Sequence, residues 1–530
     1  MFQRIVQLAV LLFTTVPLTR AFAQSKSAAA APTLVVFITI DQLRSDYFQR
    51  FDRQLRGGLR RLSDNGAFFP NGDLDHAITE TAPGHASTMS GRFPVHTGIV
   101  MNSQGVNTAQ SPLIDAPEIG ASPFRFQGTT LADWMKAKQP SMRFLSVSRK
   151  DRGAILPIGR SKGPVFWYSA NGKFTTSTYY DDSLPTWVRT FNARKLPQSY
   201  AGKSWTTLLP ASQYAEPDSV PLESNGVDYF FPHQVPPIPQ DAAATAAGYP
   251  WMDDITLQFA LAGVNELGLG SSATRTDLLA VSLSTTDAIG HRFGPDSREL
   301  HDQILRLDRS LGVFLDSLLA LRGRQRILVA LTSDHGVTPF PELKSKIYPN
   351  GDAKRVNLSS IWRIHHARLI DSGVDSTAMA FEEGVFFVRD PKAFSKVRIN
   401  ADSAAAAFGA DVRMVQGVQR ADLMSDLARA DTTKDTIARR WLHMFAPNGG
   451  ARLIVTLTPY SYWSAVTFAT HGSPNDSDAR VPVLFWGAGV QPGKYPGYAR
   501  VVDMAPTLAA LLKVTPLEAL DGRVLRQAIH

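Results

Sequence analysis

The sequence predicts an α/β fold in which helices flank a mainly parallel central sheet and inserted regions form a cap. Three apolar runs, at residues 34–40, 278–284 and 327–331, are rich in β-branched residues and have the length of buried strands. Continuous hydrophobic runs of this kind are typical of strands that helices cover on both faces. Helical patterns alternate with these runs, which indicates a parallel sheet.

The chain begins with an apolar stretch at residues 5–18 that follows Arg4 and precedes small residues at the spacing of a cleavage site. This arrangement is typical of a secretory signal peptide, which we assign to residues 1–23. The alternative is a membrane anchor, but the stretch has 14 residues and contains Pro17, whereas a spanning helix needs about 20 apolar residues. We therefore expect a periplasmic or secreted protein with no stable membrane insertion after signal removal.

The composition limits the chemistry that the chain can perform. It contains no cysteine, which excludes disulfides, thiolate nucleophiles and cysteine-based zinc sites, so a metal would have to bind to His, Asp and Glu. The formal charge of +8 suits anionic substrates, but the basic residues are scattered rather than clustered. We interpret them as a solvated surface and expect no nucleic-acid partner, with nucleic-acid binding as the weaker alternative.

Further elements complete one catalytic domain at residues 24–530. Apolar residues recur at three and four residues over 297–320, which predicts a helix, and the run at 481–486 predicts a fourth strand with Pro near its start. Residues 163–248 and 341–460 interrupt the alternation of strands and helices. Chemically suggestive residues lie on both sides of these two segments, so we expect them to be insertions in a single domain.

The first three predicted strands share one feature, an aspartate at or just after the carboxyl end. These residues are Asp41, Asp287 and Asp334. Ligands of open parallel sheets bind beyond this edge, so the three carboxylates are expected to converge there.

Histidines accompany these aspartates. His291 follows Asp287 by four residues, His335 follows Asp334 directly, and His471 precedes the fourth strand. Any one of these residues alone could be a helix cap or a turn residue, but together they offer enough oxygen and nitrogen ligands for two zinc ions.

A helix start near Thr81 supplies a candidate nucleophile. Pro83 favours a helix beginning here, which places Thr81 at or beside the N-cap, where free amides stabilise negative charge. A metal beside this hydroxyl would activate it for attack. A capping threonine without chemistry is the alternative.

Six segments resemble, in order, the type I phosphodiesterase and nucleotide pyrophosphatase group of the alkaline phosphatase superfamily. They contain Asp41, Thr81 to His85, Asn102, Asp287 to His291, Ser333 to Gly336 and His471. The resemblance implies one zinc held by Asp287, His291 and His471, and a second held by Asp41, Asp334, His335 and the nucleophile Thr81. It also implies that Asn102 donates a hydrogen bond to a nonbridging phosphate oxygen.

The segment containing Lys150 and Arg152 resembles the Lys-Asp-Arg segment of phosphate-irrepressible periplasmic alkaline phosphatases within this group. There the two side chains contact phosphoryl oxygens, and their charges suit the extra charged oxygen of a monoester. We therefore predict a phosphomonoesterase that acts on small-molecule phosphate esters through a phosphothreonine intermediate.

Three other functions are weaker alternatives. A phosphodiesterase or nucleotide pyrophosphatase of the same group comes first. A sulfatase is disfavoured because the cysteine from which most make formylglycine is absent, and a zinc-binding protein without turnover is disfavoured by the complete ligand set. The sequence predicts neither the oligomeric state nor the physiological ester.

Overall fold

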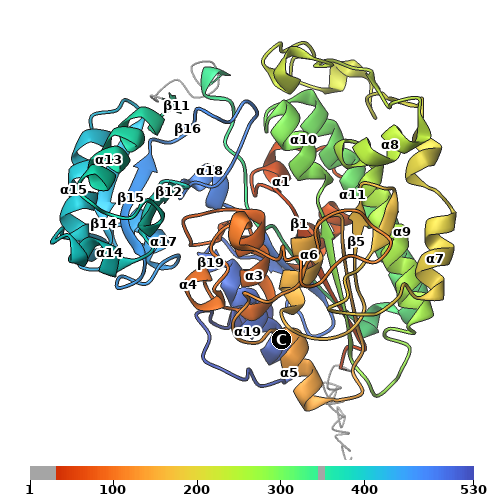
Figure 1. The fold of residues 1–530 in the computed structure, drawn as a ribbon. Coiled ribbons are helices and arrows are strands. Elements are labelled where there is room, and N and C mark those ends of the chain that lie inside the picture. The colour runs from red at the N-terminus through yellow and green to blue at the C-terminus, as the bar shows by residue number, and fades with distance from the viewer. Residues whose placement is uncertain (1–30, 344–352) are drawn as a thin grey trace, which may run out of the picture.

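The computed structural model describes residues 31–343 and 353–530, so the predicted signal peptide lies outside the described residues. Within this part of the chain, the predicted α/β fold is confirmed, with a nine-stranded sheet between two layers of helices (Figure 1). Five adjacent strands in its centre run parallel, in the order β10 (Ile327–Thr332), β1 (Leu34–Ile40), β9 (Asp277–Leu283), β4 (Phe144–Ser148) and β5 (Val165–Ser169). No helix in the two described ranges is both long enough and apolar enough to cross a membrane.

Antiparallel strands extend the sheet on both sides. On one side β17 (Val483–Gly487) runs antiparallel to β10, followed by β2 (Ala67–Phe69) and β18 (Gly493–Lys494). On the other side β6 (Lys173–Thr175) pairs antiparallel with β5. The strand predicted at residues 481–486 therefore exists, although it begins after Pro482, whose missing N–H cannot take part in the ladder.

The central strands are hydrophobic throughout because both of their faces are buried. In β1, Leu34, Val36 and Ile38 point into one core, and Val35 and Phe37 point into the other. Successive side chains of a strand alternate between faces, so an uninterrupted apolar run requires cover on both.

Helices supply this cover. The first core includes residues of α2 (Gly58–Asn65), α9 (Trp251–Glu266) and α11 (Arg298–Arg322). The second core includes residues of α3 (Thr81–Ser90), α5 (Leu131–Lys138), α6 (Asp151–Ile155) and α19 (Met504–Leu512). The helix predicted at 297–320 corresponds to α11.

The first region expected as an insertion, residues 163–248, departs from that expectation at its start. Its first two strands, β5 and β6, belong to the main sheet, so the irregular part begins only after β6. The remainder forms α7 (Thr186–Ala193), β7 (Ser204–Trp205), β8 (His233–Gln234) and α8 (Pro239–Thr245). These elements add apolar side chains such as Trp205 to the first core.

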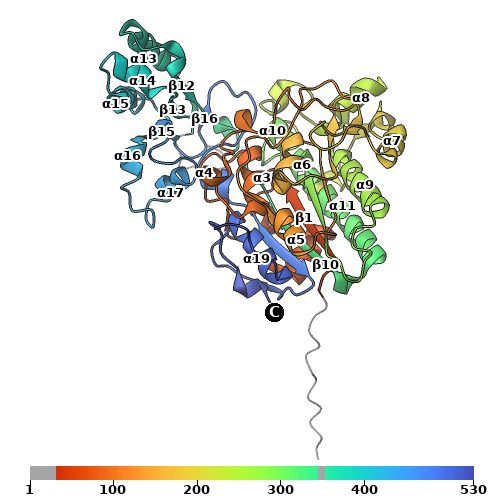
Figure 2. The same cartoon turned by 60° about the horizontal axis from the view of Figure 1, so that its bottom comes forward.

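Residues 353–463, which we call the cap, have a core of their own. Their antiparallel sheet has the order β12 (Met379–Glu382), β13 (Val385–Val388), β15 (Ala451–Leu457) and β14 (Val418–Leu423). Its helices include α13 (Ser359–Asp371), α14 (Pro391–Lys396), α15 (Ala401–Val412) and α17 (Thr436–Leu442). Figure 2 shows α13, α14 and α15 standing away from the main sheet.

The cap is fixed to the main domain beside the start of α3. Ile78 and Met101 of the main domain are buried in one cluster with Met424 and Trp441 of the cap. Because Ile78 lies three residues before Thr81, this contact ties the position of the cap to the segment that carries the candidate nucleophile.

Candidate active site

The three predicted carboxylates meet at the carboxyl edge of the parallel strands. Asp41 follows β1, Asp334 follows β10 by two residues, and Asp287 lies in the first turn of α10 (Thr285–Phe293) after β9. Their exposed fractions are 0%, 0% and 4%. The ammonium of Lys150 lies between two of them, with Nζ 2.6 Å from Asp41 Oδ2 and 2.7 Å from Asp287 Oδ2.

Thr81 is the first residue of α3, and its hydroxyl faces this group of carboxylates. Lys150, at the N-cap of α6, donates a hydrogen bond from Nζ to Thr81 Oγ1 at 3.2 Å. His335 Nε2 lies 3.4 Å from the same oxygen. Thr81 is 1% exposed, so its hydroxyl is buried between a cation and an imidazole.

Close packing of α3 against the end of β10 sets this geometry. A Cβ atom on Gly84 would lie 2.2 Å from the carbonyl oxygen of Asp334, nearer than any real Cβ contact. Glycine at this position therefore allows the first turn of α3 to approach the carboxylates.

Asp287, His291 and His471 form the first group that could hold a metal ion, since their ligand atoms all lie within 4.8 Å of one another. Each imidazole uses Nδ1 toward a backbone carbonyl: His291 toward Ala469 O at 2.6 Å and His471 toward Thr79 O at 2.7 Å. When Nδ1 donates its proton to a carbonyl, Nε2 of a neutral imidazole is unprotonated and has a free lone pair. The Nε2 atoms of His291 and His471 are 3.2 Å apart. Two lone pairs this close repel each other unless a cation between them accepts both, as a zinc ion does.

Asp41, His85 and Asp334 form the second such group, and all three are buried. Both outer carboxylate oxygens face positive or polarisable groups, since Asp41 Oδ2 lies 2.6 Å from Lys150 Nζ and Asp334 Oδ2 lies 3.1 Å from His85 Nδ1. His335 adds a nitrogen here, with Nε2 3.4 Å from Asp334 Oδ2 and Nδ1 directed to Gly336 O at 2.9 Å. Buried carboxylates are costly unless positive charge compensates them, and oxygens and imidazole nitrogens this close together are ligands that suit a metal ion.

The electrostatics of the site keep two of its ligands, Asp287 and His471, in the forms that bind metals. Burial disfavours charge on Asp287, but Lys150 and His291 outweigh it and hold the pKa of this carboxyl well below its usual range. Burial, together with His335 and His291, holds the pKa of His471 well below its usual value. Asp287 is therefore ionised and His471 neutral, as metal ligands must be.

Of the two remaining predicted residues, Asn102 contacts the residue next to Thr81, whereas Arg152 forms no hydrogen bond with Thr81. Asn102 accepts a hydrogen bond at Oδ1 from Ala82 N at 2.9 Å, which leaves its amide nitrogen to donate. Arg152 is the second residue of α6, where its Nη1 is 3.6 Å from Asp151 Oδ1 and its Nε has no hydrogen-bond partner among the described residues. Arg152 thus stands near the site without joining the contacts between Lys150 and Thr81.

The structure adds His85 to the site. Its Nδ1 lies 2.9 Å from Thr81 O and 3.1 Å from Asp334 Oδ2, and its Nε2 lies 2.8 Å from Ser282 Oγ. His85 was within the Thr81 segment quoted above, but only its position one helical turn after Thr81 could have indicated that it faces the same way.

Gln42 and Glu80 are two further additions next to predicted residues. Gln42 Nε2 donates to Asp287 Oδ1 at 3.0 Å, and Glu80 Oε2 accepts from Asn102 N at 2.6 Å. Burial and the neighbouring Glu383 raise the pKa of Glu80 to about 7. Both residues orient a predicted site residue, and no sequence pattern indicates such a role.

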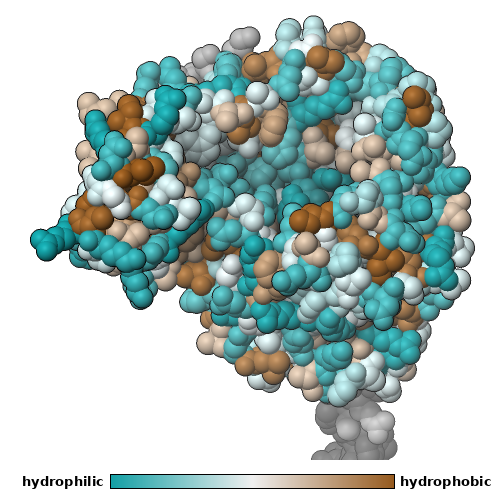
Figure 3. Space-filling view, viewed as in Figure 1, coloured by the Kyte–Doolittle hydropathy of each residue, from teal (hydrophilic) through white to brown (hydrophobic). Residues whose placement is uncertain are grey.

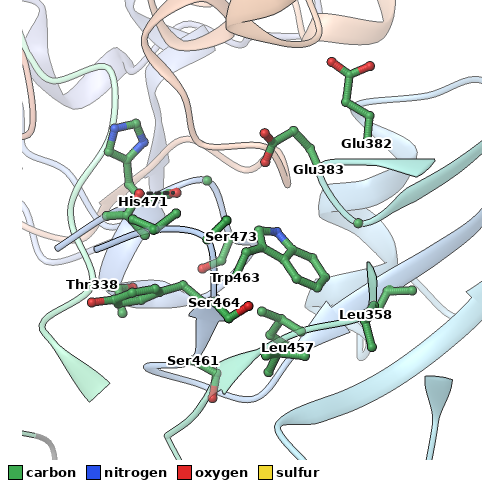
Figure 4. A pocket seen from close by; sticks show the side chains of 18 of the residues that line it. Thr338, Leu358, Glu382, Glu383, Leu457, Ser461, Trp463, Ser464, His471 and Ser473 are labelled. Carbon is green, nitrogen blue, oxygen red and sulfur yellow. Dashed lines mark hydrogen bonds between the residues drawn. The ribbon is translucent and has the colours of Figure 1, made fainter. Parts of the chain in front are cut away.

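The site opens into a cavity of about 650 Å³ between the main domain and the cap. Figure 3 shows that this side of the molecule is hollowed between the two, with mostly hydrophilic residues in the hollow. In the close view, His471 stands on one side of the cavity, and Glu382 and Glu383 of the cap stand on the other (Figure 4).

Comparison with known proteins gives consistent results. A family model described as type I phosphodiesterase / nucleotide pyrophosphatase matches residues 35–437. Alkaline phosphatase PhoV of Synechococcus elongatus is 32% identical over 524 residues, which cover 94% of this chain and 92% of that protein. Alkaline phosphatase PhoK of Sphingomonas sp. is 30% identical, with 94% and 91% covered.

A solved structure is similar over its whole length. The crystal structure of wild-type alkaline phosphatase PafA superposes with a TM-score of 0.86 at 26% identity, covering 95% of this chain and 100% of that one. A second PafA structure carries substitutions of one threonine, one asparagine, one lysine and one arginine. These are the residue types of Thr81, Asn102, Lys150 and Arg152.

Proposed function

This chain belongs to the type I phosphodiesterase / nucleotide pyrophosphatase family, and we propose that it acts as an alkaline phosphatase, a zinc-dependent hydrolase of phosphate monoesters. The observation that carries this proposal is the hydrogen bond from Lys150 Nζ to Thr81 Oγ1. A monoester has one more charged oxygen than a diester, and an ammonium beside the nucleophile can neutralise it.

The two groups of ligands described above suit two zinc ions. Asp287, His291 and His471 would hold one, and Asp41, Asp334 and His335 would hold the other next to Thr81. When bound, the ions supply Lewis acidity that lowers the pKa of a hydroxyl and offsets charge on the phosphoryl and leaving oxygens.

Thr81 Oγ1 is the proposed nucleophile. It attacks phosphorus in line, the bond from oxygen to phosphorus forms, and the ester bond on the opposite side breaks, which leaves a phosphothreonine. Water then cleaves the phosphothreonine and releases inorganic phosphate. The hydrogen bond from Lys150 stabilises the negative charge that Oγ1 carries before attack and regains when water displaces it.

Three side chains are the proposed partners of the nonbridging oxygens. Lys150 donates to Thr81 Oγ1, the Asn102 side chain is held by the amide of Ala82 next to Thr81, and Arg152 follows Lys150 by two residues in the first turn of α6. The first amides of α3 add the positive end of a helix at the same point.

Export is part of this proposal. The charged and apolar pattern of residues 1–23 supports a cleaved signal peptide ahead of one catalytic domain with two insertions, and so a periplasmic or secreted enzyme. Sequencing the N-terminus of protein recovered outside the cytoplasm tests this, since an uncleaved Met1 on the exported protein would contradict it.

The activity is tested by comparing kcat/KM on phenyl phosphate with that on diphenyl phosphate, a matched monoester and diester. We expect the monoester to be the better substrate. A clear preference for the diester would replace the proposal with a phosphodiesterase of the same family.

A further inference from the structure

The cavity beside the site lies on one side of the reacting centre. His291, His471 and Asn102 contribute to its wall, whereas Thr81, Asp41 and Asp334 do not. In an in-line displacement the leaving group departs opposite the nucleophile. A group that leaves on the side away from Thr81 therefore enters this cavity, past His291 and His471.

The cavity is lined by acidic side chains, whereas the proposed phosphoryl site next to Thr81 contains the cation of Lys150. Of the described residues that line it, Glu80, Glu382, Glu383 and Asp478 are acidic, and none is lysine or arginine. Asp478 is buried and accepts hydrogen bonds from Ser473 and Thr338, and Glu80 accepts one from the amide of Asn102. The half-buried Glu382 and the exposed Glu383 are the acidic residues that the cap contributes.

These two glutamates are weakly compensated. Glu382 Oε1 accepts a hydrogen bond from Ser103 Oγ at 2.9 Å, and its other oxygen is 3.8 Å from Arg389, a residue 57% exposed in its side chain. Glu383 forms no ion pair with any described lysine or arginine. Desolvation of its carboxyl group and the neighbouring Glu382 raise the pKa of Glu383, so a cation between these carboxylates and the site would be stabilised.

Aromatic side chains also line the cavity. Phe468 is 42% exposed and stands edge-on to His291, with ring centroids 5.2 Å apart. Trp463 lies beneath Glu383 in the close view (Figure 4). Aromatic rings of this kind bind apolar groups by stacking and cations through their faces.

We propose that this cavity is a leaving-group subsite that selects phosphate monoesters by charge. It favours leaving groups with an aromatic or apolar body that are neutral or cationic, and it disfavours leaving groups that carry a further anion. The inference rests on the proposed phosphatase activity, and it assigns Glu382 and Glu383 to specificity rather than to chemistry.

The test uses three phenyl phosphates, unsubstituted or carrying a para-trimethylammonium or a para-carboxylate group. We expect the ratio of kcat/KM for the cationic ester to that for the anionic ester to fall about tenfold in the E382Q/E383Q double variant. Comparing the same ratio between variant and wild type cancels the intrinsic reactivity of the esters. Glu266→Gln, at the exposed end of α9, removes the same kind of charge outside the cavity and should leave the ratio unchanged.

The dependence of the preference for the cationic ester on salt concentration is a second test, and because it uses the wild-type enzyme it does not require the variants to fold. The cation preference of the wild-type enzyme should shrink as ionic strength rises, since the cavity is open to solvent and its charges are screened. If the ratio of kcat/KM for the cationic ester to that for the anionic ester responds neither to salt nor to the double substitution, the proposed subsite is wrong. In that case, turnover of unsubstituted phenyl phosphate still supports the proposed phosphatase function. If phenyl phosphate itself is not hydrolysed, the proposed function fails and the subsite fails with it.

Discussion

Lys150 donates a hydrogen bond to Thr81 across 3.2 Å, although the two residues are 69 positions apart and belong to different helices. The same Nζ lies within 2.7 Å of carboxylates from both candidate metal groups. One ammonium therefore links the proposed nucleophile to both groups, and this arrangement makes Lys150 the most informative residue to change.

Lys150→Ala should damage monoester turnover much more than diester turnover. A hydrogen bond to a charged group contributes about 1.5 to 3 kcal/mol, so we expect kcat/KM for phenyl phosphate to fall on the order of ten- to a hundredfold. The diester has an esterified oxygen at this point and loses less. Lys392→Ala, on the exposed surface of the cap, is the matched control. Equal loss on both substrates with full metal content would contradict the monoesterase assignment.

Thr81→Ser should retain measurable activity, whereas Thr81→Ala should lose most of it, because only the serine variant keeps a hydroxyl at the start of α3. Mass spectrometry of enzyme quenched in acid during turnover should find phosphate on the peptide that contains Thr81. Phosphate trapped only on a different residue would defeat the assignment of the nucleophile.

The purified enzyme should contain close to two zinc ions, and chelators should abolish its activity. His471→Ala removes one ligand of the first group and should lower the zinc content toward one ion, measured by elemental analysis. His366→Ala, on α13 of the cap, should leave the zinc content unchanged. A fully active sample with no tightly bound metal would rule out the proposed cofactor.

Glu223 makes stability depend on pH. Burial, together with Glu299 and Asp218, raises the pKa of this carboxyl from 4.5 to about 9, and its Oε2 has no hydrogen-bond partner. The folded protein therefore keeps a proton that the unfolded chain loses above its lower pKa. The contribution of Glu223 to the free energy of unfolding is therefore fully present below a pH of about 4.5 and is lost as the pH rises toward 9. Between these values the free energy of unfolding falls by up to about 1.4 kcal/mol per pH unit.

Glu223→Gln removes this ionisation. The melting temperature of the variant should rise relative to wild type as the pH increases from about 5 to 9. The exposed substitution Glu266→Gln should show no such trend. A difference between Glu223→Gln and wild type that stays constant across this range would mean that Glu223 does not hold its proton in the folded enzyme.

The sequence could predict the central sheet because burial on two faces leaves a local pattern. The run at 34–40 coincides with β1, and the run at 278–284 differs from β9 by one residue. Parallel strands end at one edge, so Asp41, Asp287 and Asp334 could be expected together before any contact was known. For the same reason the helix start at Thr81 could be read from Pro83 and its neighbours.

Other parts of the site could not be predicted because they depend on contacts between distant segments. Whether Lys150 would reach Thr81, whether His85 would face Asp334, and where the cap would dock are decided by packing between elements. The sequence also left β5 and β6 inside the first expected insertion, since short apolar runs among Pro, Ser and Gly do not by themselves show which sheet a strand joins.

Local patterns along the chain were thus enough for the α/β class, the aspartates and histidines near the strand ends and the candidate nucleophile, because each depends on neighbours within one turn or one strand. The folded structure was needed to show that Lys150 lies between the two carboxylates, that His291, His335 and His471 direct Nδ1 to carbonyls, and that an acidic cavity lies between the cap and the main domain. Those features require side chains from separate elements to meet, and close packing of the whole chain fixes such meetings.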